Sequence, residues 1–273
     1  MRDDPRYEGL ARLIRAARRP PAGRGRIALA LCLGLATHLT FAAAGLAMIA
    51  AMFTGLSESF GRVPQPWAWA ANLLLIAQFP LVHSLLLTRR GGRVLGRLIP
   101  GPHGGALATT SYALIASLQL IALFALWTPS GVIWWRAEGW AFALVCASYA
   151  AAWLMLMKAS FDAGLEVQSG ALGWLSLVGR IPVRFPGMPV LGLFRFIRQP
   201  IYVAFALTLW TVPVWTPDQL LLALSYTAYC LFAPRFKERR FAERYGAQFE
   251  TYRCAVPYAL PKIVDTNRRT DGT

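Results

Sequence analysis

Long apolar runs separated by short polar connections dominate this chain. Four of the runs are long enough to cross a membrane as helices, which takes about twenty residues each. These runs are 27–56, 66–88, 105–127 and 139–157. A fifth apolar region, 201–233, contains Pro213 and Pro217. Because proline ends or kinks a helix, this region predicts a hairpin of two short helices, with one long kinked helix as the alternative.

The whole pattern predicts an all-α fold, that of a polytopic helical membrane protein. It would have four full spans and a C-terminal helical hairpin, about six membrane segments in all, followed by a cytoplasmic C-terminal helix. The composition supports this fold, because 56% of the 273 residues are hydrophobic and only 15% are charged. Soluble domains carry about 25% charged residues.

The basic residues are concentrated in alternate connections. Of the 28 Lys and Arg residues, 26 lie in residues 1–26, 89–104, 158–199 and 235–273, and the intervening connections hold only Arg62 and Arg136. Positively charged connections stay in the cytoplasm, so we expect both termini there and the chain in a bacterial inner membrane. The net charge of +15 then fits a basic face beside anionic lipid, and we expect no nucleic-acid partner.

The chain divides into three segments. Residues 1–26 are basic and amphipathic, with Leu10, Leu13 and Ile14 on one helical face, which predicts a short helix on the cytoplasmic surface. Residues 27–262 form the membrane domain, and residues 263–273 predict a disordered tail. The four cysteines form no CxxC or Cys/His cluster, so we expect neither a structural disulfide nor a bound metal.

Polar residues next to apolar spans mark candidate sites, because burying them in lipid is costly. His83, beside Ser84 near the end of the second run, is either an interhelical hydrogen-bond residue or a polar contact in a cytoplasm-facing cavity. His38, within the first run, is interpreted as a packing or interhelical hydrogen-bond residue. Asp162 and Glu166 would share one face of a helix. Such a pair can serve acid–base chemistry, but we favour a solvated helix end.

A third group of polar residues flanks the predicted hairpin. The segment RQPIY, residues 198–202, enters the hairpin, and FKERRFAERYGAQFETYRCAVPYALP, residues 236–261, follows it. A short hairpin would bring the two segments together on the cytoplasmic side. The residues concerned are Arg198, Gln199 and Tyr202 before it, and Glu238, Tyr245, Tyr252, Val256 and Pro257 after it. The alternative is an arginine reaching the interface, an interfacial tyrosine and a charged amphipathic helix.

The same residues resemble the isoprenylcysteine carboxyl methyltransferase superfamily of integral-membrane methyltransferases. Its motifs are Arg-His-Pro-x-Tyr before a helical hairpin, Glu-Glu-x-x-Leu, Gly-x-x-Tyr-x-x-Tyr and a Val-Pro-x-x-x-Pro ending. Residues 198–202, 237–241, 246–252 and 256–261 are similar to these in the same order. The pairs His83-Ser84, Phe161-Asp162 and Gly164-Leu165 further resemble bacterial methanethiol S-methyltransferases. The resemblance covers about residues 70–262.

This resemblance implies a membrane methyltransferase, with its catalytic half in residues 158–262. A methyl group would move from S-adenosylmethionine to a small thiol or lipophilic acceptor at the cytoplasmic face, among membrane lipids. The implied catalytic residues are Arg198, Tyr202, Glu238 and His83. The implied cofactor-binding residues are Arg198, Gln199, Pro200, Tyr202, Glu238, Tyr252, Val256 and Pro257. Carboxylate and aromatic groups among them would stabilise the cationic donor.

Two positions depart strongly from the superfamily motifs, and Phe249 in place of a tyrosine is a milder departure. Gln199 stands where the superfamily has histidine, and Lys237 stands where it has the first glutamate. Glutamine can donate and accept hydrogen bonds but does not titrate near neutral pH, so it could help to bind a cofactor but could not act as a base. Two other functions stay open: an NADPH-dependent reductase similar to sterol reductases, and a non-catalytic relative linked to denitrification.

Overall fold

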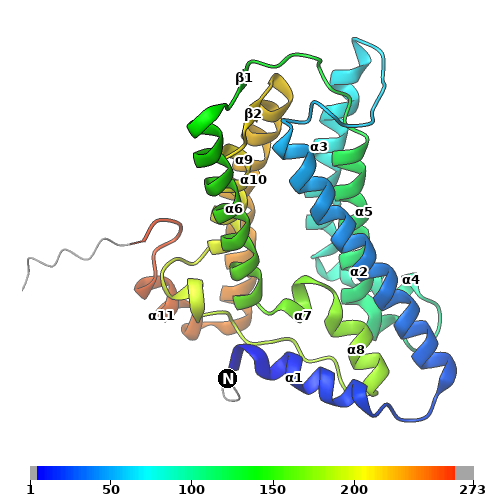
Figure 1. The fold of residues 1–273 in the computed structure, drawn as a ribbon. Coiled ribbons are helices and arrows are strands. Elements are labelled where there is room, and N and C mark those ends of the chain that lie inside the picture. The colour runs from blue at the N-terminus through cyan, green and yellow to red at the C-terminus, as the bar shows by residue number, and fades with distance from the viewer. Residues whose placement is uncertain (1–4, 262–273) are drawn as a thin grey trace, which may run out of the picture.

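The computed structural model describes residues 5–261, which form mainly helices that run side by side (Figure 1). Four helices are long and apolar enough to cross a membrane: α2 (Arg24–Phe53), α3 (Trp67–Leu86), α5 (Gly104–Ala125) and α6 (Gly139–Asp162). They match the four predicted spans and confirm the all-α polytopic fold. The predicted tail, 263–273, lies outside the described residues.

The outer surfaces of these helices are apolar, as expected for contact with lipid. Leu35 and Leu46 on α2 are 63% and 67% exposed, and Leu74 on α3 is 70% exposed. Large exposed apolar surfaces of this kind are rare on soluble proteins. The chain is therefore a membrane protein, and lipid is the medium in which these side chains are stable.

The fifth apolar region forms the predicted hairpin, not one kinked helix. Helix α9 (Pro200–Trp210) and helix α10 (Pro217–Tyr245) are joined by a turn, and both begin with proline at a position where its missing N–H costs nothing. Strand β2 (Val214–Trp215) in the turn pairs antiparallel with strand β1 (Trp135–Arg136). This pairing fixes the hairpin turn to the connection before α6.

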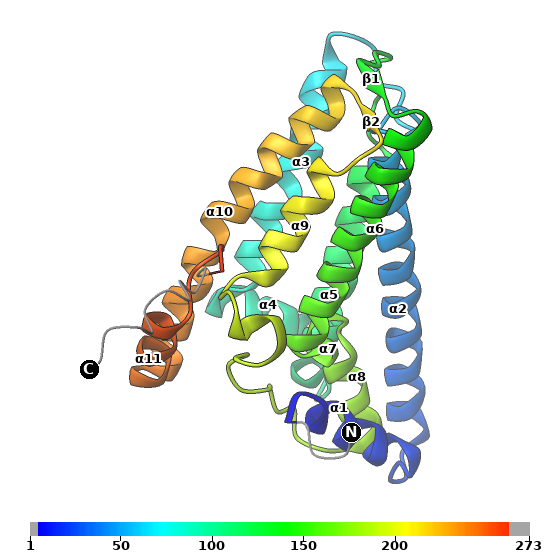
Figure 2. The ribbon, with the colours of Figure 1, turned by 60° about the vertical axis from the view of Figure 1, so that its left-hand side comes forward.

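Helix α10 is longer than the apolar region predicts. It continues past Pro234, which is buried within it, and carries the charged segment as far as Tyr245. The short helix α11 (Ala247–Ala255) then turns back beside it, at the end of the molecule remote from β1 and β2 (Figure 2). The second helix of the hairpin and the charged segment are therefore one continuous helix, α10, and this helix positions Lys237 and Glu238.

The remaining short elements gather at the same end as α11, which we call the basic end (Figure 1). They are α1 (Pro5–Arg18), α4 (Arg89–Leu98), α7 (Leu165–Gln168), α8 (Ala171–Gly179) and the 3-10 turn η1 (Gly192–Arg195). Helix α1 packs on α8, and Leu13 is fully buried there while Ile14 is 40% exposed. The predicted surface helix is thus present and is held by protein contacts.

At the opposite end of the molecule, a buried carboxylate connects two segments of the chain. The sequence pattern did not predict this contact. Asp218, in the first turn of α10, accepts hydrogen bonds from Trp127 Nε1 (3.0 Å), from Ser130 N (3.0 Å) and from Ser130 Oγ (2.5 Å). Trp127 is also part of the main apolar core, with Met52 and Leu209. One aspartate therefore joins the start of α10 to the connection after α5.

Candidate functional site

The start of α9 lies beside the C-terminal segment, as the sequence predicted. Arg198 N donates to Pro257 O (2.9 Å), and Gln199 N donates to Tyr258 O (3.1 Å). Val256 and Pro257 therefore contribute backbone carbonyls to this arrangement. The hairpin brings together two segments that are more than fifty residues apart in the sequence.

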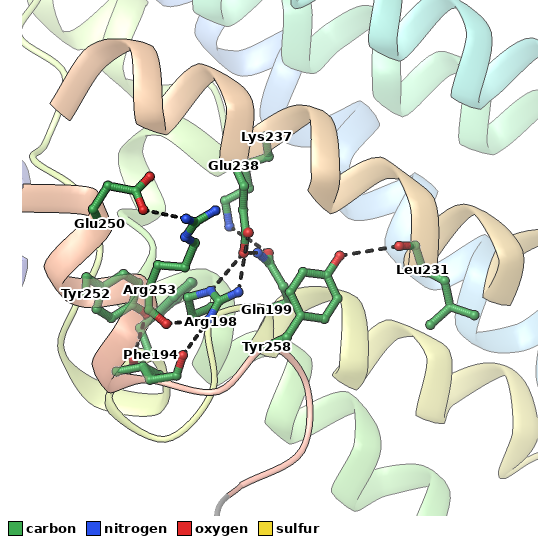
Figure 3. Close-up of polar contacts among 11 residues, drawn as sticks. Phe194, Arg198, Gln199, Leu231, Lys237, Glu238, Glu250, Tyr252, Arg253 and Tyr258 are labelled. Atoms are coloured by element: carbon green, nitrogen blue, oxygen red, sulfur yellow. Dashed lines mark hydrogen bonds and ion pairs between the residues drawn. The ribbon is translucent and has the colours of Figure 1, made fainter. Parts of the chain in front are cut away.

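Four polar side chains form a connected network here, which we call the Arg198–Glu238 cluster: Arg198, Gln199, Lys237 and Glu238 (Figure 3). Glu238 Oε1 accepts from Arg198 Nε (2.9 Å) and from Gln199 Nε2 (2.7 Å). Arg198 Nη1 also donates to Val256 O (2.6 Å). Only 11% of the Arg198 side chain and 16% of the Glu238 side chain are exposed, so these charge-assisted bonds are shielded from water.

Lys237 extends the network into an aromatic environment. Its Nζ donates to Gln199 Oε1 (3.2 Å) and lies 5.3 Å from the ring centroid of Phe194, 5.4 Å from that of Phe241 and 5.9 Å from that of Tyr202. Burial lowers the pKa of Lys237 to about 8, and the nearby Glu238 carboxylate partly opposes this shift. Sequence reasoning noted Lys237 as a departure from the motif but did not place it in the site.

The tyrosines of the C-terminal segment have separate roles. Tyr252 Oη donates to Phe194 O (2.7 Å), and burial raises the pKa of Tyr252 to about 12. Tyr245 was expected in the same group, but it packs edge-on against Phe241. Tyr258 was not singled out, yet its ring lies 5.5 Å from the Arg198 guanidinium. Tyr252 and Tyr258 thus lie at the border of the Arg198–Glu238 cluster.

The cluster has little free space. Its void is about 10 Å³, which is the room of roughly one water molecule. The lining offers aromatic rings, a carboxylate and a guanidinium, so in chemistry it matches the charged groups of S-adenosylmethionine. As these side chains lie, however, a molecule of that size does not fit in this void.

A larger cavity lies on the other side of Pro189, which lines both spaces. We call it the Asp162 cavity, and its volume is about 460 Å³. Its charged lining residues are Glu8, Arg12, Asp162, Glu166 and Arg184. Residues 185–191 form an apolar wall, so this cavity combines charges of both signs with an apolar surface.

The prediction that Asp162 and Glu166 form a solvated helix end is wrong. Both are buried, at 5% and 2% exposure. Gly164, with φ 96°, ends the helical path between them, so they stand on separate helices. Asp162 accepts from Lys158 Nζ (2.5 Å) and from Leu193 N (2.9 Å). Burial raises the pKa of Glu166, while its own backbone N–H and the nearby Arg12 oppose that shift.

His83 belongs to a different group of residues from the Arg198–Glu238 cluster. Its Nε2 is hydrogen-bonded to Tyr112 Oη (2.7 Å), and its ring stacks on Phe79. Its Nδ1 is buried and has no hydrogen-bond partner within residues 5–261.

Two polar contacts between helices lie inside the membrane region, and one of them was predicted from the sequence. His38 Nε2 accepts from Trp174 Nε1 (3.1 Å), which confirms the predicted interhelical hydrogen bond. Gln78 and Gln119 were missed; Gln119 Nε2 donates to Gln78 Oε1 (2.7 Å) and joins α5 to α3. In the part of the chain that the structure describes, no group of three or more His, Cys, Asp and Glu residues is placed to hold a metal ion.

Comparison with known proteins finds several similar chains. Methanethiol S-methyltransferase 2 of Bradyrhizobium diazoefficiens is 31% identical over 209 residues, which cover 73% of this chain and 75% of that protein. Methanethiol S-methyltransferase of Mycobacterium tuberculosis is 28% identical over 196 residues, covering 71% and 78%. Nurim of Mus musculus is 32% identical over 176 residues, covering 59% and 63%. No protein-family model matches the chain, and no solved structure does.

Proposed function

The chain belongs to the methanethiol S-methyltransferase family, and from that premise we propose that it is a membrane methyltransferase with a small thiol as its acceptor. The methyl donor in this proposal is S-adenosylmethionine, and the reaction takes place at the cytoplasmic face. The observation that carries the proposal is the Arg198–Glu238 cluster. Hydrogen bonds join residues of three motif segments there, and Tyr252 of the remaining segment lines the same void and donates to Phe194 O.

We assign the charged part of the donor to this cluster. The proposed cofactor-binding residues are Arg198, Gln199, Pro200, Tyr202, Glu238, Tyr252, Val256 and Pro257. A guanidinium suits the carboxylate of the donor, and the Glu238 carboxylate suits its ammonium group. Because Arg198 and Glu238 now satisfy each other (2.9 Å), binding would replace internal contacts with contacts to the ligand. The Asp162 cavity, next to Pro189, offers the room that the cluster lacks.

The acceptor side of the proposal follows from the local charge. Arg198 donates to Glu238, the one carboxylate that lines the void (2.9 Å), and Lys237 adds a second positive charge to the same lining. Positive surroundings lower the pKa of a thiol, and the thiolate is the nucleophilic form. We also propose His83 and Tyr202 as catalytic residues, as the family motifs imply. The chain's own part in catalysis would be to orient the two reactants and exclude water.

A labelled transfer assay tests this function. The full chain, purified into lipid nanodiscs, would be incubated with methyl-labelled S-adenosylmethionine and methanethiol, ethanethiol or a longer alkyl thiol, and the thioether product measured by gas chromatography with mass detection. We expect labelled thioether from the wild type and from Glu250→Ala, and at least tenfold less from Arg198→Ala, which loses a charged hydrogen bond.

Three other results would contradict the proposal. A folded wild type that methylates none of the thiols yet binds S-adenosylhomocysteine would favour a non-catalytic relative. Oxidation of NADPH in the presence of a sterol enone, without methyl transfer, would favour the reductase. If the wild type and Arg198→Ala form equal amounts of thioether, the assignment of the donor site to Arg198 is wrong, although the methyltransferase activity is confirmed.

A further inference from the structure

The two residues that depart most from the superfamily motifs, Gln199 and Lys237, contact each other. Lys237 Nζ donates a hydrogen bond to Gln199 Oε1 at 3.2 Å, although the two residues are 38 positions apart. The Gln199 amide also donates to Glu238 Oε1 (2.7 Å). Gln199 is only 2% exposed, so its amide group is held between the two neighbours. The glutamine thus supports the lysine at a position within the site.

The Lys237 ammonium lies in a cage of three aromatic rings. The rings come from three elements: Phe194 from η1, Tyr202 from α9 and Phe241 from α10. All three centroids lie within 6 Å of Nζ, the range in which a ring face attracts a cation. Several rings at this distance are the arrangement that proteins use to bind quaternary ammonium ligands. The occupant of this cage is a cation of the chain itself.

The charges around the cage oppose a second cation. The titratable and charged groups that face Lys237 are Glu238 and Arg240 on α10, Arg198 and Tyr202 on the α9 side, and Tyr252 on α11. These groups include one negative charge, that of Glu238, and two positive charges, those of Arg198 and Arg240. Lys237 adds a third positive charge. A positively charged ligand would meet repulsion here that an uncharged ligand of the same shape would not.

We propose that Lys237 is a specificity-determining residue, because its ammonium group holds the ring-lined position that a cationic ligand would take. The site then favours the uncharged thioether S-adenosylhomocysteine over the sulfonium S-adenosylmethionine. This inference rests on the proposed function, since it concerns the donor assigned to the same cluster. Replacing Lys237 with an uncharged side chain removes both the occupant and the repulsion, and the preference for the thioether is lost with them.

A binding experiment tests the preference directly. Dissociation constants for S-adenosylmethionine and S-adenosylhomocysteine would be measured by calorimetry on the full chain in nanodiscs. The variants are Lys237→Met, which keeps an unbranched side chain one atom shorter and removes the charge, and Lys237→Arg, which keeps the charge. We expect the ratio of the two constants, sulfonium over thioether, to fall about tenfold in Lys237→Met, the effect of removing one charge–charge repulsion, and to change little in Lys237→Arg.

A second measurement tests the cage without any ligand. The chain has three lysines, Lys158, Lys237 and Lys262, so biosynthetic labelling with ¹³C-lysine gives three ε-methylene signals that Lys237→Arg assigns. Three nearby rings should displace the Lys237 signal upfield of the other two, and Phe241→Leu should reduce that displacement. A Lys237 signal that coincides with an exposed lysine would overturn the cage.

The outcomes separate this inference from the proposed function. If both nucleosides bind the wild type and Lys237→Met leaves the ratio unchanged, the specificity role is wrong and the donor assignment stands. If neither nucleoside binds any folded variant, the donor assignment fails and the preference with it. An altered ratio together with an upfield Lys237 signal supports both.

Discussion

Two polar regions at the basic end of this protein differ in how their charges are paired. In the Arg198–Glu238 cluster every charged group has a partner within the network, and the void is about 10 Å³. On the other side of Pro189, the Asp162 cavity contains five charged lining residues around a space of about 460 Å³. The cluster is therefore closed by its own ion pair and hydrogen bonds, whereas the cavity keeps free space among its charged lining residues.

This difference indicates where ligand binding would require rearrangement. A ligand of the cluster must replace contacts among Arg198, Gln199 and Glu238, and its affinity is reduced by the cost of breaking them. In the Asp162 cavity, Asp162 is already paired with Lys158, but about 460 Å³ of free space is present for a ligand. The two regions should therefore respond differently to removal of a carboxylate.

The largest effect is expected from Glu238→Ala. This change leaves Arg198 and Lys237 without their common counter-charge in a shielded place, and removing one partner of such a pair costs about 3 kcal/mol. Thermal unfolding of the full chain in nanodiscs measures the loss. Glu250→Ala is the matched control, because Glu250 pairs with Arg253 (2.6 Å) with both side chains about half exposed, and such a pair contributes less than about 1 kcal/mol. Equal destabilisation by both changes would contradict the contrast between closed and exposed pairs.

A smaller loss of about 2 kcal/mol is expected from Asp162→Asn. The amide oxygen can still accept from Leu193 N, but the charge partner of Lys158 is gone. The same unfolding measurement, repeated in a Lys158→Met background, isolates the ion pair, because effects on residues in contact are not additive. Strict additivity of the two changes would show that Lys158 contributes nothing to the role of Asp162.

The next effect depends on pH and concerns Glu166. Burial raises the pKa of this carboxyl, so the folded chain holds the proton more tightly than the unfolded chain does. Between the unfolded and the folded pKa, stability therefore falls as pH rises. Glu166→Gln removes this dependence, and its unfolding temperature should exceed that of the wild type by an amount that grows from pH 5 upward and then levels off. A difference independent of pH would mean that Glu166 titrates normally.

The smallest effect is expected from Tyr252→Phe. It removes the hydrogen bond to Phe194 O (2.7 Å) and costs about 1 kcal/mol. Tyr245→Phe is its control, because Tyr245 packs edge-on against Phe241 and a phenylalanine ring keeps that contact. Equal unfolding temperatures for the two variants would assign no stabilising role to the Tyr252 hydroxyl.

The sequence predicted those features that depend on local pattern. The spans follow from uninterrupted apolar runs, and the hairpin follows from Pro213 and Pro217, which cannot continue a helix. The meeting of Arg198 with Glu238 was predictable for the same reason, since a short hairpin returns the chain to its starting side.

The missed features depend on segments that are distant in the sequence. Asp162 looks solvated from its own neighbours, and it is buried because Leu193 returns over it. The environment of Lys237 needs rings from η1, α9 and α10 at once. Gly164 could have been read as a helix break between Asp162 and Glu166, because glycine readily adopts a positive φ. In the structure its φ is 96°. The hydrogen bond from Trp127 to Asp218 could not be predicted from the pattern of apolar and polar residues.

If the Arg198–Glu238 cluster holds the methyl donor, the affinity for S-adenosylhomocysteine depends on Arg198. Calorimetry on the wild type, Arg198→Ala and Glu250→Ala in nanodiscs, with folding checked by thermal unfolding, gives the three dissociation constants. We expect Arg198→Ala to weaken binding by between a few-fold and about a hundredfold, or about 1–3 kcal/mol, and Glu250→Ala to leave it unchanged. A folded Arg198→Ala variant that binds as tightly as the wild type would contradict the claim.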